Sequence, residues 1–139
     1  IQEINIGMTA DVGTLQRLPK LVPEGVVREL AYTGRRMSAQ RAYEVGLVNQ
    51  IFETHEELVE GVLHIANEIA TKSPLAIWGT KESVNYARDH SVADSLNFIA
   101  TWQAGMFQPK DMAAAFEAQA NSEDPDFDDL PPMRKGLGS

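Results

Sequence analysis

The sequence contains no cysteine among its 139 residues. Disulfide bonds, thiolate metal sites and cysteine nucleophiles are therefore excluded for this chain. Its apolar runs are only a few residues long, far below the ~20 residues that a membrane-spanning helix needs. Both glycine-rich phosphate-loop motifs, GxGxxG and GxxxxGK[ST], are absent, so nucleotide binding of those two kinds is unsupported.

Basic residues are also scarce: 12 stand against 20 acidic ones, and the formal net charge is −8 at pH 7. An overall negative potential repels phosphate backbones, so we expect no nucleic-acid partner.

The three histidines lack metal-ligand spacing, and no metal site is expected. Five acids gather near the end of the chain, in a tail expected to be extended or disordered: Glu123, Asp124, Asp126, Asp128 and Asp129.

The beginning of the chain predicts a short α/β segment. Residues 1–6 alternate between apolar and polar side chains, with Glu3 on the polar side, which is typical of a half-buried strand. Residues 47–52 are compatible with a second short strand. Asp11 follows a loop of small residues, and aspartate is among the preferred N-cap residues, so we expect a short helix from about Val12.

From residue 23 onward the pattern is mainly helical. Apolar residues recur at helical spacing, and Thr54 and Ser91 each precede an acidic residue by three positions, the pattern of a capping box. Antiparallel helical pairs are the natural way to bury such faces. The expected helices cover about residues 23–33, 39–45, 54–72, 74–89, 91–107 and 109–120.

Two carboxylates are the most informative candidates for chemistry. Glu3 lies in the predicted first strand and Asp11 at a predicted helix start, so a tight loop can bring both to one cleft. Two carboxylates in different environments suit proton transfer, because one accepts a proton while the other donates one. A purely structural alternative stays open. In it Asp11 is an N-cap that stabilises the helix by about 1 kcal/mol, and Glu3 faces water.

The chain resembles the enoyl-CoA hydratase/isomerase family, or crotonase superfamily, in two runs, GMTADVGTLQRLPK (7–20) and TGRRMSAQRAYEVGLVNQIF (33–52). It is also similar to a later family segment in KSPLAIWGTKESVNYARDHSVADSLNFIATW (72–102). Within the superfamily it looks closest to the dienoyl-CoA isomerase branch, which is marked by ADVGTLQRLPK and RDHSV-ADSLN. The resemblance covers about residues 1–120.

This resemblance implies an α/β crotonase-like fold, of which the chain is the C-terminal portion: one or two short strands followed by a mainly α-helical region. Residues 1–52 would be the end of the spiral core with its catalytic loop. Residues 53–120 would be a C-terminal helical oligomerisation region, and residues 121–139 an acidic, proline-rich tail.

The resemblance also implies an activity, the conversion of 3,5-dienoyl-CoA to 2,4-dienoyl-CoA by a double-bond isomerase of fatty-acid β-oxidation. Glu3 matches the family's glutamate that acts as general acid/base at the α-carbon of the thioester. Asp11 matches a position that is glycine in hydratases but aspartate in dienoyl-CoA isomerases, where it serves the far end of the diene. The implied partners are an acyl-CoA thioester and sister subunits in a homotrimer or hexamer. No cofactor is implied, because coenzyme A is part of the substrate.

Two other functions are compatible with the sequence. A plain enoyl-CoA hydratase is disfavoured by Asp11, and a non-catalytic oligomerisation fragment would use the apolar helix faces at residues 58–69 and 96–107. By the resemblance, the oxyanion-hole donors and most CoA-binding residues belong to the family's N-terminal half. We therefore assign no CoA-binding residue and expect this chain alone to be inactive or nearly so. The compartment cannot be read from the sequence, and we expect only an intracellular setting: cytoplasmic if the protein is bacterial, mitochondrial or peroxisomal if it is eukaryotic.

Overall fold

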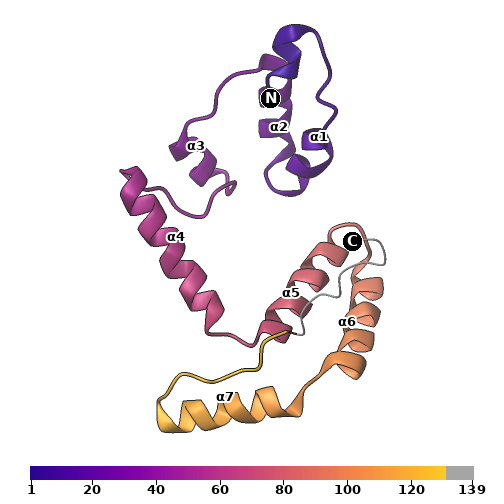
Figure 1. Cartoon of the computed structure of the whole chain (residues 1–139). Coiled ribbons are helices and arrows are strands. Elements are labelled where there is room, and N and C mark those ends of the chain that lie inside the picture. The colour runs from indigo at the N-terminus through magenta and orange to yellow at the C-terminus, as the bar shows by residue number, and fades with distance from the viewer. Residues whose placement is uncertain (131–139) are drawn as a thin grey trace, which may run out of the picture. The chain divides into compact units, whose positions relative to one another are not determined.

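The computed structural model describes residues 1–130 and divides the chain into two compact units, Ile1–Val59 and Glu60–Ser139 (Figure 1). The boundary between the units falls within one long helix. Within residues 1–130 all the regular structure is helical. The elements are η1 (Glu3–Ile6), α1 (Thr14–Arg17), η2 (Leu18–Lys20), α2 (Glu24–Thr33), α3 (Ala39–Glu44), α4 (His55–Ala70), α5 (Pro74–Ala87), α6 (Val92–Met106) and α7 (Pro109–Asn121).

The two predicted strands are not found among the described residues. Residues 3–6 form a 3₁₀ turn instead, in which the Asn5 N–H donates to Gln2 O over 2.9 Å and the Met8 N–H to Glu3 O over 2.9 Å. A strand needs a neighbouring strand to satisfy its backbone groups, and residues 1–130 provide none, so the segment satisfies them locally. Residues 47–52 form no regular element for the same reason.

Three serines cap helices that begin at, or within one residue of, the predicted starts. The hydroxyl oxygens of Ser38, Ser73 and Ser91 each accept a bond from the backbone N–H three residues later, over 3.1, 3.2 and 3.1 Å. At the start of α4 the Thr54 hydroxyl accepts from the Glu57 N–H over 3.1 Å. The predicted helix ends in this region differ from the observed ones by one or two residues.

The predicted N-cap at Asp11 is wrong. Helix α1 begins at Thr14, and its N-cap is Gly13 in a left-handed conformation with φ of 95°. A glycine adopts that conformation without the steric penalty that a side chain adds, so the chain turns at Gly13 and the helix starts later. Asp11 is left in the loop before the turn, with its carboxylate uncommitted to capping.

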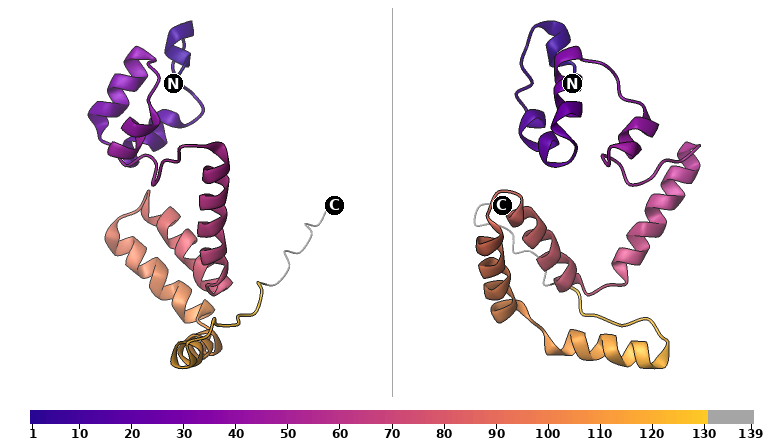
Figure 2. Two further views of the ribbon diagram at one scale, coloured as in Figure 1. Left: turned by 90° about the vertical axis from the view of Figure 1, so that its left-hand side faces the viewer. Right: turned by 180° about the vertical axis from the view of Figure 1, so that it is seen from behind.

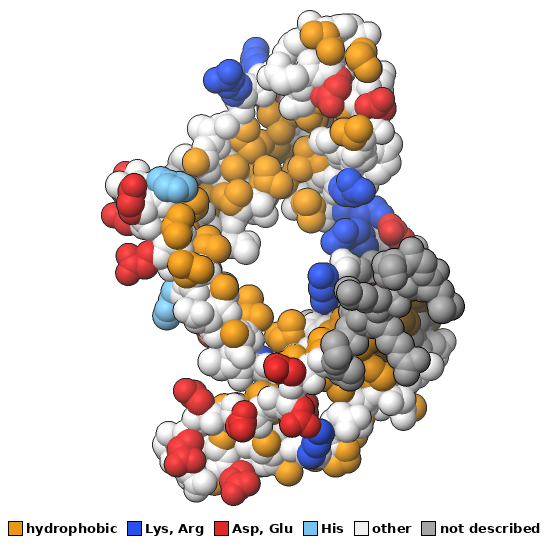
Figure 3. All heavy atoms as spheres, viewed as in Figure 1, with side chains coloured by type: hydrophobic (Ala, Val, Ile, Leu, Met, Phe, Trp, Pro, Cys, Tyr) orange, Lys and Arg blue, Asp and Glu red, His pale blue; other side chains and the backbone are white. Residues whose placement is uncertain are grey.

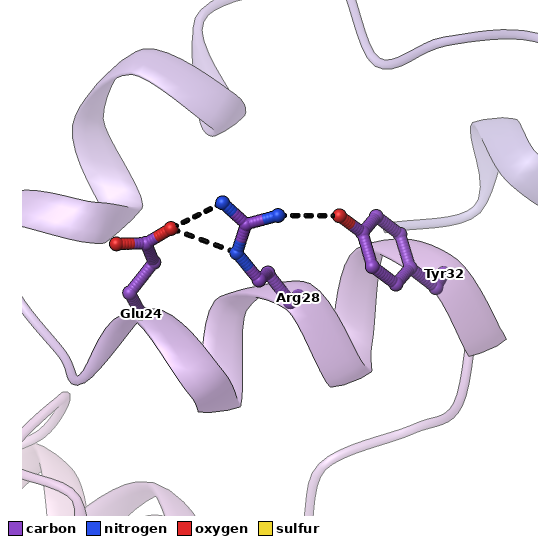
Figure 4. A network of polar contacts seen from close by, with 3 residues as sticks. All are labelled: Glu24, Arg28 and Tyr32. Atoms are coloured by element: carbon purple, nitrogen blue, oxygen red, sulfur yellow. Dashed lines mark hydrogen bonds and ion pairs between the residues drawn. The ribbon is translucent and has the colours of Figure 1, made fainter.

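Helix α2 is the main support of the first unit. Val27 buries its side chain, and a neighbouring face of the helix carries a chain of polar contacts centred on Arg28 (Figure 4). The Arg28 guanidinium donates to the Glu24 carboxylate over 2.7 Å through Nε and to the Tyr32 hydroxyl over 2.8 Å through Nη1. These bonds raise the pKa of Arg28 above its ordinary value, Glu24 contributing most. Pairs four residues apart stabilise a helix along its length.

In the second unit α5 and α6 form an antiparallel hairpin (Figure 2). Gly79 of α5 is buried, and the absence of its side chain lets the indole of Trp102 lie directly against the helix. Trp102 also meets Trp78 edge to face with ring centroids 5.0 Å apart, while Tyr86 stacks on Phe98 at 4.4 Å. Aromatic pairs in these geometries add stability beyond the area that they bury.

Few of the described residues are buried, and none of their side chains is fully enclosed. The buried hydrophobic residues are Ala10, Val22, Val27, Ala42 and Ala118. Helices α4 and α6 contain no buried residue, and large hydrophobic side chains lie at the surface of both units (Figure 3). No helix among residues 1–130 is long and apolar enough to span a bilayer.

Candidate functional site

Glu3 is the first residue of η1 and is half-buried. Its backbone carbonyl accepts the Met8 N–H, which closes the turn, and Gly7 ends the turn in a left-handed conformation with φ of 76°. The Glu3 carboxylate forms no hydrogen bond or ion pair with residues 1–130. The backbone of the turn therefore positions Glu3, while its carboxylate stays available to a ligand.

Asp11 lies at the end of the loop that follows η1. The preceding residue, Ala10, is buried at 6% exposure, so the loop is anchored immediately before the aspartate. Asp11 is exposed, and within the described residues its carboxylate has no hydrogen-bond or ion-pair partner. After it the chain turns at Gly13, where the Arg17 guanidinium lies so close that an added Cβ would be 2.7 Å from Nη1.

The two sequence-predicted carboxylates thus share one short, doubly anchored segment of the first unit. Neither is held by backbone N–H groups, which would stabilise the ionised form and oppose proton donation. Glu3 is half-buried and Asp11 is exposed, so the two carboxylates lie in different environments. Their convergence on a single cleft stays a prediction.

A groove that the sequence did not predict lies in the second unit, between α5, α6 and α7. It encloses about 500 Å³, and hydrophobic side chains such as Trp102, Met106 and Phe127 line it. At one end the Ser73 hydroxyl donates to the Asp111 carboxylate over 2.6 Å, which links the first turns of α5 and α7. This bond could not be predicted, because a partner 38 residues away leaves no local signature in the sequence.

The described part of the acidic tail folds back on this unit. Phe127 lines the groove, and the Asp128 carboxylate forms an ion pair with Lys110 of α7. The hydrogen bond from Lys110 lowers the pKa of Asp128, and the same bond raises the pKa of Lys110. Ser122 ends α7 in a left-handed conformation, and residues 123–130 form no regular element. Residues 131–139 of the predicted tail lie outside the described residues. Within residues 1–130 no three acidic or histidine side chains cluster at metal-binding distance.

Comparison with known proteins identifies the chain's relatives. The family model described as enoyl-CoA hydratase/isomerase matches residues 1–130. The chain is 42% identical over 125 residues to the human mitochondrial Delta(3,5)-Delta(2,4)-dienoyl-CoA isomerase, covering 89% of this chain and 38% of that protein. It is 42% identical over 127 residues to the peroxisomal enzyme of the same name from Arabidopsis thaliana, covering 91% of this chain and 46% of that one.

A solved structure supports the fold. The enoyl-CoA hydratase from Bacillus anthracis superposes with a TM-score of 0.84 at 32% identity, covering 91% of this chain and 48% of that one. The helical arrangement described here is therefore part of a crotonase-like fold. The chain spans less than half the length of the curated relatives that it matches.

Proposed function

Because the chain belongs to the enoyl-CoA hydratase/isomerase family, we propose that it serves an acyl-CoA double-bond isomerase that converts 3,5-dienoyl-CoA to 2,4-dienoyl-CoA. The observation that carries the proposal is the pair of carboxylates, Glu3 and Asp11, on one anchored segment with no partner among the described residues. The 42% identity to isomerases of this name from two organisms supports it.

The reaction moves one proton from one end of a conjugated system to the other. In the proposed mechanism Glu3 removes a proton from the α-carbon, and the electron pair spreads over the diene and onto the thioester oxygen. Asp11, carrying a proton, donates it to the far end of the diene, so proton number and charge are conserved. A further proton exchange restores the two carboxyl groups. Positioned acid–base groups of this kind typically contribute 10²–10⁴-fold to a rate.

We propose that the complete protein binds an acyl-CoA thioester and assembles as a homotrimer or hexamer. The apolar stripe of α4 supports an assembly, since Leu58, Val62, Ile65 and Ile69 are 42%, 53%, 44% and 48% exposed. Covering apolar surface contributes roughly 25 cal/mol per Å², so such a face favours a partner surface. The human relative is named as mitochondrial and the Arabidopsis thaliana relative as peroxisomal, and we propose an intracellular setting here.

The test replaces Asp11 with Asn in the complete protein and follows the conjugated dienoyl thioester by ultraviolet absorbance. Asparagine keeps the size but cannot deliver the proton, so turnover should fall by about 100-fold or more. Asp124→Asn, at an exposed position in the tail, is the matched control and should leave turnover unchanged. Unaltered turnover in the Asp11→Asn variant would refute the proposal.

An enoyl-CoA hydratase is the second candidate, and the likeness to a solved hydratase favours it. A hydratase adds water to a 2-enoyl thioester, which removes the absorbance of the conjugated double bond. If the complete protein hydrates 2-enoyl-CoA rapidly and leaves 3,5-dienoyl-CoA unchanged, the hydratase assignment replaces the isomerase one.

A non-catalytic role in oligomerisation is the third candidate. The exposed apolar stripes of α4 and α6 favour it, Leu96 of α6 being 62% exposed. It predicts a defined trimer or hexamer by light scattering together with no heat of binding for an acyl-CoA in calorimetry. Detectable thioester binding by the complete protein would exclude this role as its sole function.

A further inference from the structure

We infer that Asn5 is a positioning residue for Glu3, an inference that rests on the function proposed above. Asn5 lies two residues after Glu3 in η1, and its side-chain amide donates to Gly34 O over 3.3 Å and to Gln2 Oε1 over 2.9 Å. The bond to Gly34 joins residues 29 apart in sequence. It ties the turn that carries Glu3 to the end of helix α2.

The contact between Asn5 and Gly34 is close as well as polar. A Cβ built on Gly34 would be 2.5 Å from both Nδ2 and Oδ1 of Asn5, so the amide group occupies the space of the missing side chain. Gly34 is buried and left-handed with φ of 61°, and its N–H closes α2 by donating to Leu30 O over 3.0 Å. Glycine is therefore required at this position both by its backbone conformation and by the side chain that covers it.

The turn η1 depends on this contact because it has little support of its own. It is a 3₁₀ segment of four residues with no buried residue, and so short a helix is marginal in isolation. Helix α2, by contrast, is anchored by Val27 and reinforced by the Arg28 network. The hydrogen bond from Asn5 thus restricts the movement of the Glu3 backbone relative to α2. Loss of this bond allows the Glu3 carboxylate to move relative to the substrate.

Asn5→Ala in the complete protein should lower kcat by about 10- to 100-fold and change KM by less than about 2-fold, since a displacement of 1 Å can cost 10²-fold in rate. Asn5→Asp keeps the size but removes the N–H donor and places a carboxylate against the Gly34 carbonyl, so it should behave in the same way. Asn49→Ala, at an exposed position in the same unit, is the control and should leave kcat unchanged.

Hydrogen exchange provides a readout that a general loss of stability would not produce. In Asn5→Ala the N–H of Met8, which donates to Glu3 O, should exchange at least about 5-fold faster, while the N–H groups of α2 keep their rates. In Gly34→Ala the new methyl group displaces the side-chain amide of Asn5, so the N–H of Met8 should also exchange faster. If Asn5→Ala fails to fold, Asn5→Asp carries the same test.

Glu3→Gln separates the two proposals. If Glu3→Gln abolishes turnover while Asn5→Ala and Asn5→Asp keep wild-type kcat and wild-type exchange at Met8, the role of Asn5 is overturned and the proposed function stands. If Glu3→Gln keeps full turnover, the proposed function itself fails.

Discussion

Substituting Gly79 by alanine tests the packing of the α5–α6 hairpin. Alanine is favoured over glycine inside a helix by about 1 kcal/mol, so a bare helix would gain stability. Here the new Cβ would lie 2.5 Å from Nε1 of Trp102, a distance that real Cβ atoms essentially never adopt, and 3.0 Å from Cε2. The indole must therefore move.

The displacement has two costs. Overpacking a close contact typically costs 1–3 kcal/mol, and weakening the edge-to-face pair of Trp78 and Trp102 costs about 0.5–1.5 kcal/mol more. Setting these costs against the helix gain of about 1 kcal/mol leaves Gly79→Ala destabilising by about 2 kcal/mol. Urea unfolding followed by tryptophan fluorescence measures this difference, since both tryptophans of the chain lie in the hairpin.

Gly105→Ala is the matched control. Gly105 also lies within a helix, next to the last residue of α6, but no heavy atom stands within 4 Å of its Cβ position, so alanine there should stabilise by about 0.5–1 kcal/mol. In a Trp102→Leu background Gly79→Ala should lose its cost, because the clashing ring is gone. If the two alanine variants change the free energy of unfolding by the same amount, the packing argument is wrong.

Two further predictions concern the second unit. Ser73→Ala removes both the N-cap of α5 and the bond to Asp111, so urea unfolding should show a loss of about 1–2 kcal/mol, which Ser73→Thr should largely restore. The Lys110–Asp128 ion pair should keep the tail attached to α7 at all pH values between acid and strongly alkaline solution. Because pairing lowers the pKa of Asp128 and raises the pKa of Lys110, the pair should weaken as the pH falls from the ordinary Asp value of 3.8 through the lowered pKa of Asp128. It should also weaken as the pH rises from the ordinary Lys value of 10.5 through the raised pKa of Lys110. A fluorophore near Phe127 reports its release, and 1 M salt at neutral pH should have the same effect.

The predicted helix starts were correct where the signal lies within a single turn. Ser38, Ser73 and Ser91 bond to backbone groups three residues away, so each start depends on neighbours that the sequence displays side by side. The strand predicted over residues 1–6 is not observed among residues 1–130, since a strand depends on a partner strand that lies elsewhere in sequence. The cap predicted at Asp11 failed because the left-handed turn at Gly13 moved the start of α1.

The family and the candidate carboxylates were readable before any coordinates. The resemblance to the crotonase superfamily is confirmed by the family model over residues 1–130. Glu3 and Asp11 as the acid–base pair remain a prediction that the variants above test. The sequence alone could identify these two side chains as candidates, because their residue types and their separation are read from one short segment.

Contacts between segments that are far apart in sequence depend on the tertiary structure and could not be predicted. Asn5 covers Gly34, the Trp102 indole takes the place of a side chain on Gly79, and Phe127 reaches the groove between α5, α6 and α7. A helix cap follows from hydrogen bonds across four residues, whose geometry is nearly independent of context. The fit of an amide or an indole against a bare glycine depends on backbone positions far apart in the chain, so only the folded arrangement shows why glycine stands at those two places.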